Sequence, residues 1–203
     1  DNEAGRPFFF PGKVAGYENY FPNMDSLNPE YFKYVDRKIA YLNDNGFIPF
    51  IEALRRDASL LWKKHHEWPE SYVRYLQYFY SRYDAYDTVL GPVHLDIISA
   101  TISPDDFSAA IKLTEEKYGP LPYENLLSAN ANPSTFENFG EGSWVTLHQI
   151  GNKREHDFYW YLTQIFYSKH PTPSINGEPY YAGYRDARGE GIGVHYYRGA
   201  EGG

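Results

Sequence analysis

The chain contains no cysteine and no apolar run long enough to span a membrane. Without cysteine it can have no disulfide, thiolate zinc site, iron–sulfur cluster or cysteine nucleophile. It also has no Lys/Arg-rich run, since 19 basic residues stand against 27 acidic ones and the formal charge is −8. We therefore expect neither nucleic acid nor a membrane span as part of its function.

The length of 203 residues corresponds to about one domain at the usual ~100 to 200 residues per domain. We interpret residues 1–203 as a single domain. The first residues, DNEAGRPFFF, do not form a signal peptide. Because the chain starts without methionine and runs out in glycine, we expect a fragment or a processed piece of a longer protein.

Four segments have helical spacing of apolar residues together with start and stop signals. The first begins with Asn28 as cap and Pro29 where its missing N–H is harmless, and it ends at Gly46. In the fourth segment the pattern predicts burial of Phe158, Tyr161, Leu162, Ile165 and Phe166. The four predicted helices cover residues 28–45, 69–86, 103–119 and 154–169.

Strand-like runs alternate with these helices, which is typical of parallel β/α units. The five runs are residues 47–52, 88–96, 126–130, 144–149 and 173–178. Two architectures fit: an incomplete (β/α)8 TIM barrel, which usually needs ~250 residues, or an open doubly wound sheet. The nucleotide-binding version of the second lacks its glycine-rich motif here.

Polar residues stand at the carboxyl ends of these runs, where a parallel sheet places its active site. They are Glu52, His94, Asp96, Asn130, His148, Gln149 and Glu178.

Glu178 lies in the segment NGEPYY, where glycine permits a sharp turn and proline stiffens the chain after it. It is our candidate nucleophile or base, and the alternative is a solvated or salt-bridged glutamate in a turn. Asp96, in GPVHLD, is the candidate acid, with His94 on the same side of the strand. The alternative there is a structural His–Asp hydrogen bond. Paired carboxylates are what glycoside hydrolysis requires, ~5 to 5.5 Å apart for retention and ~6.5 to 9.5 Å for inversion.

Further residues are candidates for binding a substrate. Glu52, followed by Arg56 in EALRRD, offers another acid or a substrate clamp, or else a salt-bridged loop. Hydrogen bonding to sugar hydroxyls, or orientation of a carboxylate, would suit His94, Asn130, His148 and Asn152. A metal held by His148, His156, His94 and Asp96 is the rival, but no compact metal motif supports it, and we expect neither metal nor cofactor.

Aromatic residues make up 19% of the chain, more than core packing normally requires. Several of them fall in or beside expected loops and could stack on sugar rings, or simply pack: Tyr17, Tyr20, Phe21, Trp62, Trp68, Trp144, Tyr180, Tyr181, Tyr196 and Tyr197. The pair His65 and His66 reads as an exposed loop without a role.

An ordered series of motifs resembles the apiosidase-like family of (β/α)8 glycoside hydrolases over about residues 5 to 184. They are NPEYFKYVDRKIAYLNDNGFIPFI, SANANPSTFENFG, WVTLHQIGNKREHDFYWYL and NGEPYY. The resemblance implies that the five runs are barrel strands three to seven and that Glu178 is the nucleophile-type glutamate. It also implies a secreted, periplasmic or cell-surface protein. At the fourth strand this chain has the segment GPVHLD. Many members of the family that it resembles have a Trp-rich segment ending in Gly-Glu at this place.

These observations predict a glycoside hydrolase that acts on a polysaccharide or its side chains. The missing barrel strands are expected from flanking sequence or another chain. The alternatives are a non-catalytic carbohydrate-binding pseudo-enzyme, a polysaccharide lyase, and a fragment that is inactive because its barrel does not close.

Overall fold

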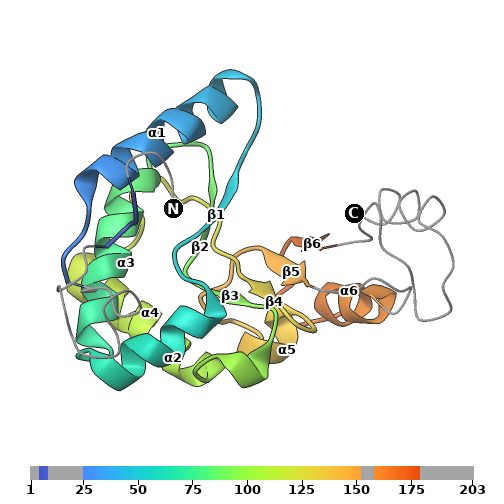
Figure 1. Ribbon diagram of the computed structural model, residues 1–203. Coiled ribbons are helices and arrows are strands. Elements are labelled where there is room, and N and C mark those ends of the chain that lie inside the picture. Colours follow the sequence, from blue (N-terminus) through green and yellow to red (C-terminus); the bar gives the residue numbers. More distant parts are fainter. Residues whose placement is uncertain (1–4, 9–24, 152–157, 179–203) are drawn as a thin grey trace, which may run out of the picture.

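The computed structural model describes residues 5–8, 25–151 and 158–178. Its elements follow the order α1 (Pro29–Asp44), β1 (Phe50–Glu52), α2 (Arg56–His65), α3 (Glu70–Tyr83), β2 (Val89–Gly91), β3 (His94–Leu95), a 3-10 turn (Ile98–Ala100), α4 (Pro104–Tyr118), β4 (Asn130–Ala131), α5 (Thr135–Phe139), β5 (His148–Ile150), α6 (Phe158–Phe166) and β6 (Ser174–Asn176). Figure 1 shows the short strands between the helices α1 to α4 and the helix α6. The predicted alternation of helix and strand is thus confirmed.

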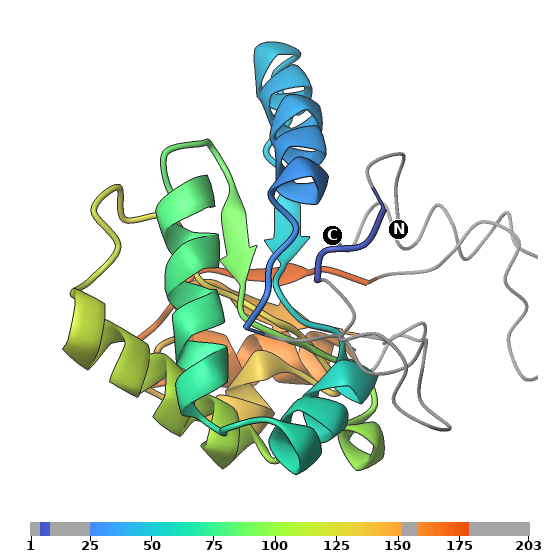
Figure 2. The same cartoon turned by 60° about the vertical axis from the view of Figure 1, so that its left-hand side comes forward.

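The strands are parallel, and β3 continues β2 along the chain, so that both lie between the segments of β1 and β4. β1 pairs with β2, β3 with β4, and β5 with β6, each in parallel register. Figure 2 shows β1 and β2 running in the same direction. The row continues between the pairs, because Leu90 bridges Leu127 and the Gly151 amide donates to the Ala131 carbonyl at 3.0 Å. A doubly wound sheet would reverse this order at a switch point, and the described strands show no reversal.

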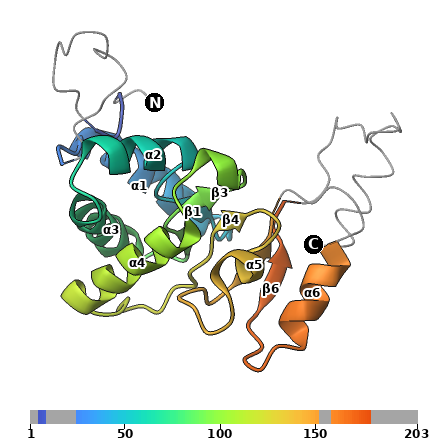
Figure 3. The ribbon, with the colours of Figure 1, turned by 90° about the horizontal axis from the view of Figure 1, so that it is seen from below.

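Seen from below in Figure 3, α3 and α4 lie on one flank of the strands, and α6 lies beside β6. In the described ranges the strands form three two-stranded sheets, β1-β2, β3-β4 and β5-β6. No helix in that part of the chain is long and apolar enough to cross a membrane.

The helix starts follow the capping rules used on the sequence. The Asn28 side chain accepts from the Glu30 amide, and the Ser103 side chain accepts from the Asp106 amide. Both helices then begin with proline, and α1 ends within one residue of the predicted position. The fourth helix was predicted to start at Arg154, which lies outside the described residues. The structure describes this helix, α6, from Phe158.

Several expectations about local structure are wrong. The run 88–96 is two strands, β2 and β3, separated at Pro92, which has no N–H for a ladder bond. His65 does not lie in a loop, since it is the last residue of α2. This helix was not expected from the sequence, because Arg55 provides no side-chain cap. On α6, Ile165 is buried as predicted, but Phe166 is 71% exposed.

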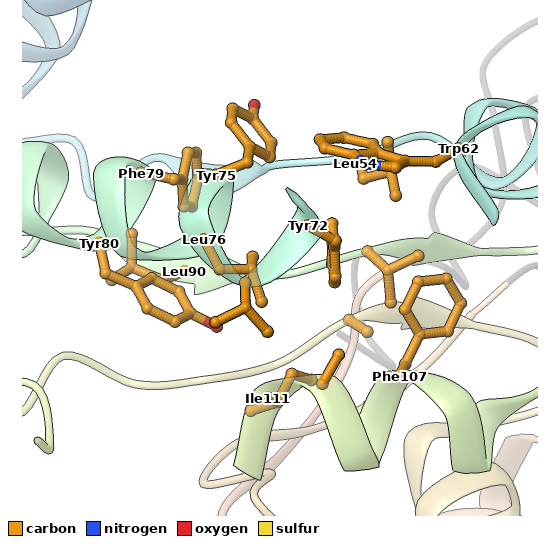
Figure 4. Packing of buried hydrophobic residues seen from close by; sticks show 14 of the residues in the cluster. Leu54, Trp62, Tyr72, Tyr75, Leu76, Phe79, Tyr80, Leu90, Phe107 and Ile111 are labelled. Atoms are coloured by element: carbon orange, nitrogen blue, oxygen red, sulfur yellow. The ribbon is translucent and has the colours of Figure 1, made fainter. Parts of the chain in front are cut away.

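The main core packs α1, α3 and α4 against β2 and β3 and is rich in aromatic rings. Figure 4 shows Tyr72, Leu76 and Tyr80 of α3 together with Phe107 and Ile111 of α4. Trp62 is 0% exposed. It was predicted in or beside a loop as a stacking candidate, but it lies within α2 and packs edge-on against Tyr72 at 5.3 Å between centroids.

Two buried tyrosines join this core to the ends of the strands. The Tyr75 hydroxyl donates to the Ala53 carbonyl at 2.9 Å, directly after β1, and the Tyr72 hydroxyl donates to the Pro92 carbonyl at 2.7 Å, between β2 and β3. Burial raises the pKa of the Tyr72 hydroxyl, so it remains a neutral donor. The core thereby fixes the backbone where the candidate site residues emerge.

Candidate functional site

Glu52, the last residue of β1, is held from two sides at the carboxyl ends of the strands. One of its oxygens lies 2.5 Å from Nδ1 of His94 on β3. The other accepts from the Asn130 backbone N–H on β4 at 3.1 Å. The parallel register brings these strand ends together, since His94 is paired with Asn130. Glu52 thus occupies the middle of the group and has a fixed orientation.

Asp96 follows β3 and is part of the same group. Its Oδ1 lies 2.5 Å from Nη1 of Arg56, the first residue of α2, and 3.2 Å from Nε2 of His94. A guanidinium this close stabilises a negative charge on the carboxylate. Because α2 starts four residues after Glu52, it places Arg56 at the same end of the sheet.

A cavity of about 410 Å³ opens over these residues. Its lining consists of Glu52, Leu54, Arg55, Arg56, His94 and Asp96. The hydrogen bond from Glu52 raises the pKa of His94, burial opposes that rise, and the charges of Glu52 and Asp96 reinforce it. The cavity is therefore lined by charges of both signs.

Glu178 lies two residues beyond β6 and joins the group through Asn130. The Asn130 side-chain amide donates to Glu178 Oε2 at 3.2 Å. One series of ion pairs and hydrogen bonds therefore runs from Arg56 through Asp96, His94, Glu52 and Asn130 to Glu178. It connects the two carboxylates that the sequence patterns indicated as a pair.

Three glycines at the strand ends leave room for these side chains. A Cβ at Gly91 would lie 2.9 Å from Cγ of Glu52. A Cβ at Gly151 would overlap the side-chain oxygen of Asn130 and the carbonyl oxygen of Ala131, and one at Gly177 would overlap the side chain of Gln149. The roles of Gly91 and Gly151 were not predicted from the sequence. Their signal is a glycine at a strand end beside a polar residue of the preceding strand.

His148 lies apart from this group, facing the helical layer. It is 2% exposed, its Nδ1 lies 2.9 Å from the Thr135 hydroxyl on α5, and its ring packs edge-on against Phe136. Burial lowers its pKa. The Thr135 hydroxyl also accepts from the Gln149 amide at 2.9 Å, so the contacts of His148 are structural in kind.

Trp144 also lies apart. It lines a second cavity, of about 380 Å³, with residues of α4 and of the loops that lead into β4 and β5, and it packs edge-on against Phe139. Trp68 stacks on Tyr72 at 4.9 Å between centroids. Of the other candidates, Asn152, Tyr180 and Tyr181 lie outside the described residues, as do His156, Tyr17, Tyr20, Phe21, Tyr196 and Tyr197.

Within the described ranges no group of three or more His, Asp or Glu side chains is arranged to hold a metal ion. The chemistry available to the site is that of carboxylates, an imidazole, a guanidinium and an amide.

Comparison with known proteins gives two results. In its fold the chain is similar to a protein from Bacteroides vulgatus ATCC 8482 whose crystal structure is described as that of a "putative glycoside hydrolase", with a TM-score of 0.64 and 20% identity. The match covers 86% of this chain but 34% of that protein, so the chain spans about a third of its length. None of the curated proteins matches.

The family comparison covers nearly the whole chain. The description "Apiosidase-like, catalytic domain" matches residues 3–195, which include every element of the site. The resemblance seen in the sequence motifs is thereby confirmed, and the chain belongs to the apiosidase-like family.

Proposed function

We propose that the chain is part of a glycoside hydrolase that cleaves O-glycosidic bonds in a polysaccharide or its side chains with two carboxylates. Glu178 is the nucleophile or base, and Asp96 is the acid. The observation that carries the proposal is the series of ion pairs and hydrogen bonds that links Asp96 to Glu178 at the carboxyl ends of parallel strands. Membership of the apiosidase-like family supports it.

The same proposal extends to the architecture. Parallel strands that alternate with helices along the chain are what strands three to seven of a (β/α)8 barrel would present. The likeness in fold to the Bacteroides protein supports this assignment. A secreted or cell-surface location stays a prediction of the family resemblance.

Substitution of the two carboxylates tests the function. Release of reducing ends is measured on a panel of plant, algal and microbial polysaccharides and on 4-nitrophenyl glycosides, including the apioside. We expect Glu178→Gln to lower kcat/KM about 10³-fold or more, because the amide can neither attack carbon nor activate water. Asp96→Asn should lower it about 10²- to 10⁴-fold.

Glu116→Gln, at an exposed position of α4, is the matched control and should leave kcat unchanged. Full activity in both Glu178→Gln and Asp96→Asn would disprove the assigned pair. Products that absorb as unsaturated uronates would instead identify a lyase and overturn hydrolysis.

A carbohydrate-binding pseudo-enzyme is the second candidate, and one observation favours it. Asp96 is paired with Arg56 at 2.5 Å, an arrangement that suits a permanent anion better than a proton donor. Binding of a glycan by the full-length protein, with no reducing ends released across the panel, would establish this candidate and refute the hydrolase.

A further inference from the structure

A single imidazole lies between two carboxylates in the candidate site. Nδ1 of His94 is 2.5 Å from Glu52 Oε2, and Nε2 is 3.2 Å from Asp96 Oδ1. The exposed fraction of the side chain is 25% for His94, 21% for Glu52 and 17% for Asp96. Since an ionised carboxylate only accepts hydrogen bonds, both ring nitrogens are placed to donate, and an imidazole with two N–H groups is a cation.

The surroundings of His94 contain charges of both signs. Glu52 faces it from β1 and Asp96 from the turn after β3, while Arg56 and Arg55 line the same cavity at the start of α2. Glu178 is connected to this group through Asn130. The hydrogen bond and charge of Glu52 raise the pKa of His94, with a further contribution from Asp96. The two arginines oppose a cation at this position, and burial also disfavours it.

This arrangement bears on how Asp96 could act as an acid. Arg56 donates to Asp96 at 2.5 Å, an arrangement typical of a carboxylate that accepts rather than of an acid that donates. The neighbouring Nε2–H of His94 lies within hydrogen-bond reach of the same carboxylate. The proton that the reaction needs is then available on the imidazolium rather than on the carboxyl group.

We propose that His94 holds the proton of the glycosidase reaction at rest and delivers it through Asp96. This inference rests on the proposed function. As the glycosidic C–O bond breaks, its electron pair stays on the leaving oxygen, which takes a proton from Asp96. Asp96 takes the Nε2 proton, leaving His94 neutral, while Glu178 attacks the anomeric carbon or deprotonates the water that does.

The proton balance closes with one water molecule. If Glu178 forms a covalent glycosyl ester, water later displaces it, giving its hydroxyl to the anomeric carbon and its proton to Asp96, which returns it to His94. If water attacks directly, its proton passes to Glu178 and then to solvent, and solvent reprotonates His94. In both cases an alcohol and a hemiacetal are released, and His94 acts as a positioning residue, through Asp96.

The first test needs no catalytic activity. In an NMR titration of the imidazole ¹⁵N signals of the 203-residue chain, we expect His94 to titrate above its ordinary value of about 6.5. The substitutions Asp96→Asn and Glu52→Gln should each lower that midpoint. His148, which is buried and contacts the Thr135 hydroxyl, serves as an internal reference below about 6.5. A His94 midpoint at or below this ordinary value would overturn the inference whatever the activity.

The second test uses leaving groups of different acidity on the sugar that the glycoside panel selects. His94→Gln, which keeps a donor amide but no titrating proton, should lower kcat/KM about 10²- to 10⁴-fold on an alkyl glycoside. The loss should be less than about tenfold on the 2,4-dinitrophenyl glycoside, whose leaving group needs no proton. The alkaline limb of the pH profile should also disappear.

Equal losses on both glycosides would show that His94 is merely structural and would refute its role as the proton source. Failure of the hydrolase proposal is distinguishable, because then Glu178→Gln would leave turnover of both glycosides unchanged.

Discussion

The aromatic core around α3 and the polar strand ends handle buried hydrogen-bonding groups in different ways. In the core, rings pack against one another, and neutral groups such as the Tyr72 hydroxyl and the Trp62 indole N–H each have a neutral partner. At the strand ends, the His94 imidazole lies between the carboxyl groups of Glu52 and Asp96, so the ionisation of one group depends on the others. Changes in the core should therefore mainly affect stability, whereas changes at the strand ends should mainly affect ionisation and function.

The largest expected effect is a loss of stability when a buried ring of the core is removed. Trp62→Ala removes a fully buried ring and the 2.8 Å hydrogen bond from its indole to Ser71. We expect the free energy of unfolding to fall by about 3–5 kcal/mol. Trp160→Ala, at a 64% exposed position of α6, should stay within about 0.5 kcal/mol. Denaturant unfolding followed by circular dichroism measures both, and equal losses would contradict the assigned packing.

A smaller loss of stability is expected when a glycine at a strand end, next to the side chains of the site, is replaced. At Gly151 an added Cβ meets the Asn130 side chain and the Ala131 carbonyl, so Gly151→Ala should cost about 1–3 kcal/mol and displace Asn130 from Glu178. Gly91→Ala is the matched comparison, because its nearest contacts, Cγ of Glu52 at 2.9 Å and the Ile51 carbonyl oxygen at 3.3 Å, are less close than those at Gly151. Thermal denaturation should show the larger loss for Gly151→Ala, and the reverse order would contradict this geometry.

The smallest expected effect is on the pH dependence of stability, in which we compare His94 at the strand ends with His148 against α5. The pKa of His94 is raised in the folded protein, so its stabilising contribution is complete below about pH 6.5 and is lost as pH rises through the raised value. The pKa of His148 is lowered by burial, so its fit to the core is complete above about pH 6.5 and is lost as pH falls through the lowered value.

His94→Gln and His148→Gln should therefore change the pH dependence of stability in opposite directions. Between about pH 5 and 9, the stability lost in His94→Gln should be greatest at the acid end, and that lost in His148→Gln at the alkaline end. Unfolding in urea at a series of pH values measures this. Parallel curves for the two variants would mean that both histidines share one environment.

Much of the local structure could be predicted from residue type. The capping side chains of Asn28 and Ser103 and the apolar spacing of α3 determined where three helices lie. The short helix α5 also has a sequence signal, although it was not predicted, since Ser134 caps the Glu137 amide in an S-x-x-E pattern. Strand boundaries were less accurate, because Pro92 interrupts an otherwise continuous apolar run.

The site was predictable in its place but not in its connections. The pattern of strand ends alone indicated Glu52, His94, Asp96, Asn130 and Glu178, because carboxyl ends of parallel strands share one edge. The sequence could not show that His148 turns to the helical layer, since a one-residue difference in register reverses the face of a strand residue. Nor could it separate stacking aromatics from packed ones such as Trp62.

The absence of cysteine and of basic clusters, the alternation of helices and strands, and the family motifs were properties of the sequence by itself. They determined the class of fold and the edge of the sheet that carries the polar residues. Only the tertiary structure decided that His94 lies between Glu52 and Asp96 and that Asn130 reaches Glu178. The reason is physical: the contacts of Glu52 with His94 and Asn130 join residues 42 and 78 positions apart, and parallel register rather than local propensity sets such distances.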